Sequence, residues 1–95
     1  PTFSWETLPT AKSYTIQIDN EDQFIGPRTF NTANPSFTFN EAQGYNETVY
    51  WRVRGASAPN GGGVATSWSE TFTYTVEWDK TARSVARAGP AGFPG

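Results

Sequence analysis

The stretch Val49-Tyr50-Trp51-Arg52-Val53-Arg54 decides the fold class of this chain. Apolar and polar side chains alternate in it without a break, so Val49, Trp51 and Val53 share one face. A period of two residues is that of a β-strand with one face in the core and the other in water. The stretch therefore predicts a central strand with Trp51 in the middle of the core.

Length and composition predict one all-β domain. The chain has 95 residues, enough for one domain with a single core. Aromatic residues make up 16% of it, whereas leucine occurs once, at Leu8. Aromatic and β-branched residues favour pleated surfaces, and leucine-rich sequences favour helices. We therefore expect antiparallel strands throughout.

The other strands are predicted from alternating segments separated by turn residues. These segments are 1–5, 13–19, 28–32 (a short edge strand), 36–40 and 68–78. Together with the central stretch they give about six strands, a number typical of an antiparallel sandwich. Phe24 follows a polar turn, and we expect it to fold back under the sheet. The segment from Gly55 to Ser67, with its run of glycines, is expected to be a flexible, solvated loop. The predicted core is Phe3, Trp5, Tyr14, Ile16, Ile18, Phe37, Phe39, Val49, Trp51, Val53, Phe72, Tyr74 and Val76.

Four motifs occur in the order and spacing of a fibronectin type III domain. They are Trp5, Ala11-Lys12-Ser13-Tyr14, Tyr50-Trp51-Arg52-Val53-Arg54 and Ser67-Trp68-Ser69. Residues 1–78 resemble most the repeats of microbial surface proteins and polysaccharide-degrading enzymes. The resemblance implies a seven-stranded, immunoglobulin-like β-sandwich in which this chain supplies strands B, C, C′, E, F and G. Val49 stands where the family usually carries the tyrosine of its tyrosine corner.

The resemblance also implies a first strand, A, which is missing ahead of Pro1. The chain starts without methionine, and we expect it to be a fragment or a processed form. Strand B would then have an unpaired edge, open to strand addition. Preceding residues of the parent protein are expected to cover this edge, and a segment from a neighbouring chain is the alternative.

The C-terminal residues have a different composition. Residues 79–88 are expected to be a linker, with a short helix as the alternative, because Asp79 could cap one and Trp78, Ala82, Val85 and Ala86 share a face. Residues 89–95 place glycine at every third position, with two prolines between. This resembles the Gly-X-Y repeat of collagen, whose crowded axis admits only glycine. We therefore hypothesise a collagen-like stalk and a homotrimer.

The sequence offers no catalytic site. It contains neither histidine nor cysteine, which excludes Ser-His-Asp and Cys-His catalysis and thiolate or imidazole metal sites. Its acidic residues are scattered over turns and strand ends, where nothing would tune their pKa values. The segment from Asp19 to Gln23 lacks the length and glycine of a calcium loop and is interpreted as a turn. We expect a non-enzyme without catalytic residues, metal or cofactor.

The polar face of the central strand carries the best candidate site. Tyr50, Arg52 and Arg54 are predicted to lie opposite Trp68, where arginine can stack on the indole ring. The pattern is similar to half of the Trp-Ser-x-Trp-Ser ladder of cytokine receptors. The favoured interpretation is structural, with the arginine stems covering the rings, and a ligand site is the alternative. Asn46 begins an Asn-Glu-Thr sequon, a possible glycosylation site.

These features predict a structural or adhesive module of an extracellular fibre or multidomain cell-surface protein. Its expected partners are proteins, either neighbouring domains or identical subunits in a trimer or filament. A net charge of −2 without a basic cluster gives no basis for nucleic-acid binding, and no segment is apolar enough to span a membrane. The alternatives are an ancillary domain of a secreted glycan-active enzyme, contacting carbohydrate through exposed aromatic residues, and a receptor ectodomain module.

Overall fold

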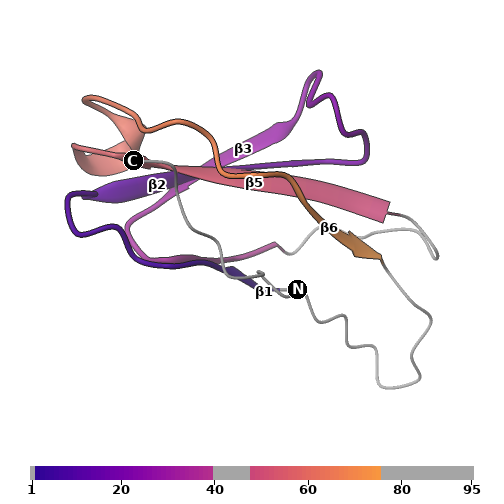
Figure 1. Ribbon diagram of the computed structural model, residues 1–95, viewed down its shortest axis with the longest axis horizontal. Coiled ribbons are helices and arrows are strands. Elements are labelled where there is room, and N and C mark those ends of the chain that lie inside the picture. The colour runs from indigo at the N-terminus through magenta and orange to yellow at the C-terminus, as the bar shows by residue number, and fades with distance from the viewer. Residues whose placement is uncertain (1, 40–47, 76–95) are drawn as a thin grey trace.

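The computed structural model describes residues 2–39 and 48–75, and these form an all-β, antiparallel fold (Figure 1). Among the described residues, the one other regular element is η1, a short 3-10 helix. In chain order the elements are β1 (Thr2–Ser4), β2 (Ser13–Asp19), β3 (Arg28–Thr32), β4 (Ser36–Thr38), β5 (Thr48–Ala56), η1 (Pro59–Gly61) and β6 (Phe72–Thr75). The predicted all-β class is thus confirmed for these residues. Val76, Asn46, the segment 79–88 and the tail 89–95 lie outside the described residues, and the predictions made for them stay predictions.

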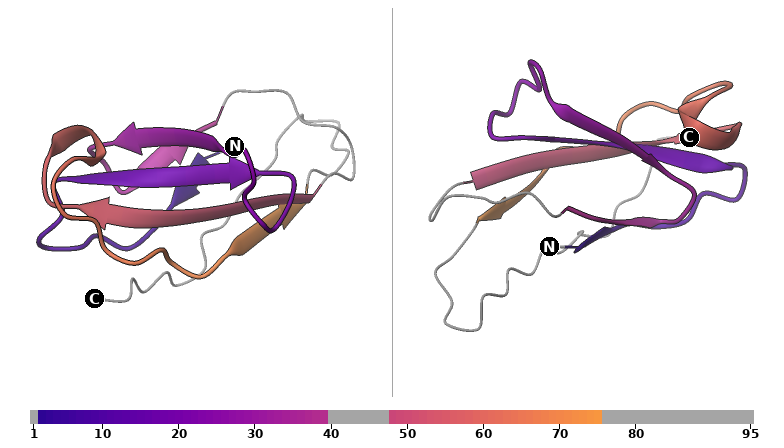
Figure 2. Two further views of the ribbon diagram at one scale, coloured as in Figure 1. Left: turned by 90° about the horizontal axis from the view of Figure 1, so that it is seen from above. Right: turned by 180° about the vertical axis from the view of Figure 1, so that it is seen from behind.

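The strands form two antiparallel sheets. One has the order β3-β2-β5-β6 and the other pairs β1 with β4. In the larger sheet, Ile18 is paired with Trp51 and Ser13 with Ala56, so β2 and β5 run side by side over the whole length of β2. Figures 1 and 2 show β1 facing the larger sheet across a gap between the ribbons. Side chains fill this gap, as the 4.9 Å distance between the ring centroids of Phe3 and Trp51 shows.

The core lies between the two sheets and centres on Trp51, which is completely buried. Its ring contacts Phe3 from β1 and Phe72 from β6, with centroids 4.9 Å and 4.8 Å away. The buried members of the cluster are Phe3, Trp5, Tyr14, Ile16, Ile18, Phe39, Val49, Trp51, Val53 and Tyr74. Phe37 and Phe72 are half-buried and pack against this cluster. The alternation in the central stretch therefore corresponds to the burial of its side chains: Val49, Trp51 and Val53 lie in the core, and the residues between them lie on the outer face.

Several strand ends differ from the sequence prediction. β4 ends at Thr38, and β6 begins at Phe72 although the apolar alternation pointed to Trp68. The delay of β6 has a cause at Ser69, whose hydroxyl accepts the hydrogen bond from the Val53 amide at 3.0 Å. A side chain thus takes the place of a backbone carbonyl at this point. Regular backbone pairing between β5 and β6 is found only from the pair Trp51 and Phe72 onward.

The segment from Gly55 to Ser67 is held by hydrogen bonds, and most of its residues beyond Ala56 are exposed, as expected for a solvated loop. The Ser57 amide donates to the Val64 carbonyl, and the Ala58 amide donates to the Gly62 carbonyl. The hydroxyl of Ser13 reaches it from β2: it donates to the Ala58 carbonyl at 2.6 Å and accepts from the Gly61 amide at 2.9 Å. The loop consequently covers the start of β2.

The outer face of β2 is less exposed to solvent than its alternating sequence predicts. Ser13 and Thr15 point away from the core, yet both are buried. The Thr15 hydroxyl donates to the Asn31 side chain on β3 at 2.7 Å. Gly61 sits directly above this pair, and a Cβ added there would lie 2.5 Å from the Asn31 oxygen. Its backbone angle φ of +76° also favours glycine at this position.

Candidate functional site

The candidate site lies on the outer face of the larger sheet. The strand register pairs Gln17 with Arg52 and Thr15 with Arg54, so both arginines project from β5 away from the core. Tyr50 follows on the same face, paired with Asp19 on β2 and Thr73 on β6. The arginines were predicted to lie on this face, and the register places them two residues apart on one strand.

Arg52 is held between two aromatic rings. Its guanidinium carbon lies 4.3 Å from the ring centroid of Phe24 and 4.4 Å from that of Trp68. Two of its nitrogens donate to one oxygen of Gln17, from Nε at 3.0 Å and from Nη2 at 2.7 Å. The guanidinium is therefore engaged by two rings and one side-chain amide of the protein itself.

Arg54 lies over the same indole, with its guanidinium carbon 4.4 Å from the Trp68 centroid. Burial lowers the pKa of the Arg52 guanidinium, and the positive charge of Arg54 lowers it further. The negative faces of the rings offset part of this repulsion. We call the set Phe24, Arg52, Trp68 and Arg54 the ladder.

Phe24 belongs to the ladder although the sequence suggested a place under the sheet. It is only 7% exposed, and it is buried against Arg52 on the outer face. Its φ of +52° is rare for an aromatic residue. Gln17 was also missed as a partner, although its position opposite Arg52 on the neighbouring strand could have indicated it. Tyr50 is half-buried on the same face, and the ring contacts of the arginines are made by Phe24 and Trp68 instead.

Trp68 is positioned by the residue that follows it. Ser69 is buried; its amide donates to the Val53 carbonyl at 2.8 Å, and its hydroxyl accepts from the Val53 amide. The same hydroxyl donates to the Glu70 carbonyl at 2.9 Å. These bonds tie the Ser67-Trp68-Ser69 segment to β5 and thereby place the indole beside Arg52 and Arg54.

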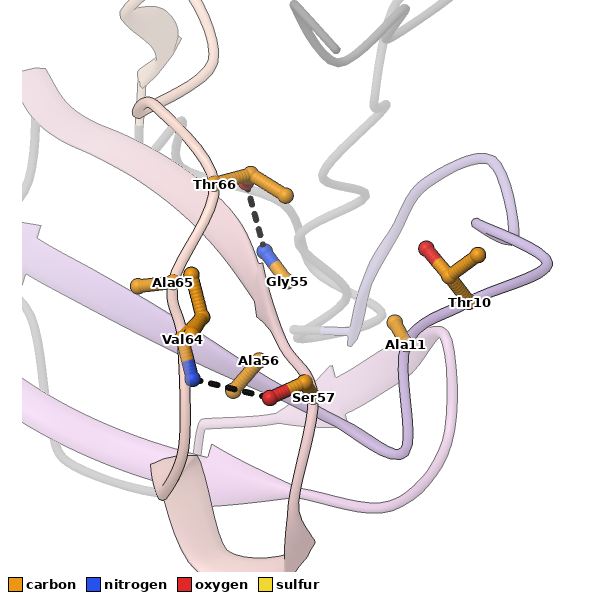
Figure 3. A pocket seen from close by; sticks show the side chains of 8 residues that line it. All are labelled: Thr10, Ala11, Gly55, Ala56, Ser57, Val64, Ala65 and Thr66. Carbon is orange, nitrogen blue, oxygen red and sulfur yellow. Dashed lines mark hydrogen bonds between the residues drawn. The ribbon is translucent and has the colours of Figure 1, made fainter.

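A small pocket lies at the end of the larger sheet (Figure 3). Its volume is about 230 Å³. Two walls come from the β1–β2 loop and from residues 64–66, and the end of β5 lies between them. A Cβ at Gly55 would lie 2.9 Å from Leu8 Cδ1 and 3.2 Å from Ala11 Cβ, so these two side chains would have to shift. The lining consists of small, uncharged residues, namely Thr10, Ala11, Gly55, Ala56, Ser57, Val64, Ala65 and Thr66.

The ladder and the pocket differ in the chemical groups that they present. Within residues 2–39 and 48–75, no three histidine, cysteine or acidic side chains come close enough together to hold a metal ion. The ladder carries two cations and two rings, and the pocket carries no ionisable group. This part of the chain also contains no helix with the length and apolar character needed to cross a membrane.

Comparison with known proteins adds no relative to this picture. No protein-family model, no curated protein and no solved structure matches the chain. The fold, the ladder and the pocket are therefore the basis for a functional proposal.

Proposed function

We propose that this chain is a fibronectin type III-like β-sandwich that serves as a non-catalytic structural or adhesive module. The sheet composition supports the fold. If β1 to β6 are named B, C, C′, E, F and G, as the resemblance implies, the sheets are B–E and C′–C–F–G. Two sheets that enclose one aromatic core are the architecture of this class of sandwich.

The proposed function rests on one observation: the side chains of the ladder make their contacts with one another and with Gln17. Arg52 is engaged by two rings and by Gln17, and Trp68 is stacked with two guanidinium groups. Such a face is a brace: it connects the β2–β3 turn, β5 and the segment before β6. A braced sandwich suits a spacer in an extracellular fibre or cell-surface protein, where its work is protein–protein assembly.

The same observation disfavours the carbohydrate-binding alternative. A sugar platform needs aromatic faces that are free to stack on the ligand. The Trp68 ring already lies against Arg52 and Arg54, at 4.4 Å from each guanidinium carbon. An ancillary domain of a glycan-active enzyme would have to give up these contacts to bind. The ladder gives no separate support to the receptor alternative, because the segment Ser67-Trp68-Ser69 supplies one Trp-Ser pair, whereas the Trp-Ser-x-Trp-Ser motif of cytokine receptors has two.

The proposal is tested by stretching and by glycan binding. In a tandem polyprotein pulled in a force microscope, each copy should unfold in one cooperative step. The contour length should grow by roughly 3.5 Å for each residue released. Unfolding without a force peak would contradict a load-bearing module. On a panel of polysaccharides we expect no binding, and specific binding that Trp68→Ala abolishes would establish the carbohydrate alternative instead.

A further inference from the structure

Two large apolar side chains are strongly exposed among the described residues, and they lie at opposite ends of the larger sheet. Ile25 is 76% exposed and Val64 is 78% exposed. Ile25 lies in the loop beyond Asp19, where β2 ends, and Val64 lines the pocket beside Ala56, which is paired with Ser13, where β2 begins. Figures 1 and 2 show the β2–β3 loop and the η1 loop at opposite ends of the molecule.

Ile25 projects from a turn that is fixed in place. The preceding Phe24 is buried against Arg52, with φ of +52°, and the following Gly26 has φ of +75°. The Phe24 amide also approaches the Glu21 carbonyl at 3.4 Å. An exposed apolar side chain on a pre-ordered turn loses little conformational entropy when a partner covers it. Ile25 therefore has the properties of an anchor residue.

The pocket at the other end fits one side chain. Its volume of about 230 Å³ falls below the range of roughly 300–1,000 Å³ that is common for small-molecule sites. A cavity needs only about 10–15 Å³ measured in this way to hold one water molecule, so the pocket has room for the four-carbon side chain of isoleucine. The uncharged lining suits an apolar guest, and a charged one would be left unpaired there.

The charges around the two ends are complementary. Residues 19–28 contain three acidic side chains, Asp19, Glu21 and Asp22, and one basic side chain, Arg28, so this end is net acidic. Around the pocket, residues 7–13 and 55–67 contain one charged side chain, Lys12, which is basic and exposed. Opposite charges at the rim of an apolar contact guide its orientation.

We infer that copies of this chain associate head to tail, with Ile25 of one copy inserted into the pocket of the next. The contact joins two different surfaces, so it does not close on itself as a two-fold dimer does. Repeated, it generates an open filament unless its rotation closes a ring. This inference rests on the proposed assembly function and names the partner, a second copy of the chain. One side chain is a small anchor, so we expect weak association, aided by effective concentrations on the order of 1 mM where copies are tethered.

The test uses the complete chain and two complementary variants. Ile25→Ser removes the anchor, and Val64→Asp places a carboxylate at the pocket and opposes the acidic turn. Both sites are exposed, and the two hydrogen bonds of Val64 to Ser57 are made by its backbone. Ile25→Leu is the conservative control, and Thr73→Asp adds the same charge at an exposed position on β6. Sedimentation equilibrium at concentrations on the order of 1 mM reports the average mass.

The wild type, Ile25→Leu and Thr73→Asp should show an average mass that keeps rising with concentration beyond that of a dimer. Ile25→Ser and Val64→Asp should each remain at the monomer mass. Their equimolar mixture should rise to the dimer mass and stop, because one variant retains only the pocket and the other only the anchor. A monomeric wild type, undiminished association of either variant, or a mixture that remains monomeric would overturn the inference. These outcomes leave the stretching and glycan tests unaffected, so the two proposals fail separately.

Discussion

Replacing Arg52 by methionine separates the two ways in which this residue can stabilise the fold. Methionine retains an unbranched apolar side chain that can cover Trp68 and Phe24, but it has no guanidinium. The favoured sequence interpretation, in which the arginine stems cover the rings, predicts almost no loss. The geometry predicts a clear loss, because the guanidinium stacks on both rings and donates twice to Gln17.

The size of the loss follows from these contacts. Each stacking contact is worth about 0.5–1 kcal/mol near the surface, and a hydrogen bond from a charged donor about 1.5–3 kcal/mol. Arg52 is half-buried, and water can replace part of the bonding to Gln17, so we expect a total of about 2–3 kcal/mol. Arg54→Met is the matched control: it removes one stacking contact, on Trp68, and should cost about 1 kcal/mol.

Urea unfolding, followed by tryptophan fluorescence, measures both variants. With a denaturant slope of about 1–3 kcal/mol per molar, Arg52→Met should lower the midpoint by roughly 1 M. A double-mutant cycle with Trp68→Ala should give a coupling energy of about 1 kcal/mol. An Arg52→Met midpoint within error of the wild type, together with zero coupling, would refute the brace and leave the arginines available to a ligand.

Three further substitutions probe the fold. Gly61→Ala should destabilise the fold by about 1–3 kcal/mol, because the residue has positive φ and its new Cβ meets Asn31. Gly62→Ala, at a residue with ordinary φ, should cost less. Equal unfolding midpoints of the two variants would contradict this. Ser13→Ala removes two hydrogen bonds at a buried site and should cost about 2–3 kcal/mol; hydrogen exchange at the Gly61 amide should accelerate, and unchanged exchange there would show that the bond is unimportant. Trp51→Ala should cost on the order of 3–5 kcal/mol in calorimetry, and a loss below about 1 kcal/mol would mean that the core is not centred on this residue.

The sequence predicts best where the period of two is unbroken. The alternation of 13–19 delimited β2 correctly, and that of 28–32 delimited β3. The prediction fails where hydrogen bonds to the backbone, and not the side-chain pattern, determine where a strand begins or ends. β5 continues to Ala56 because its pairing with Ser13 persists, although Gly55 and Ala56 carry no alternation. β6 starts late because the Ser69 hydroxyl interrupts the ladder of hydrogen bonds, a contact that no local pattern encodes.

The candidate site was predictable only in part for the same reason. Arg52, Arg54 and Trp68 could be placed together because two of them share a strand face and the third precedes the next strand. Phe24 could not, since its place against Arg52 depends on a positive φ that aromatic residues rarely adopt. The pocket also escaped prediction, because it forms between two loops that are distant in sequence.

The pairing of β2 with β5 has a consequence for the order in which the chain acquires its structure. β2 can pair early with β3, which follows after a short loop, but its other neighbour is β5, as in the pairs Asp19 with Tyr50 and Ser13 with Ala56. Folds dominated by such distant pairings form in milliseconds to seconds, because the loop must close before the contacts reward it. At a synthesis rate of about 5–20 residues per second, the hairpin of β2 and β3 leaves the ribosome seconds before β5 does. During that interval Tyr14, Ile16 and Ile18 have no Trp51 to pack against, and a chaperone that shields this face would raise the yield of folded protein.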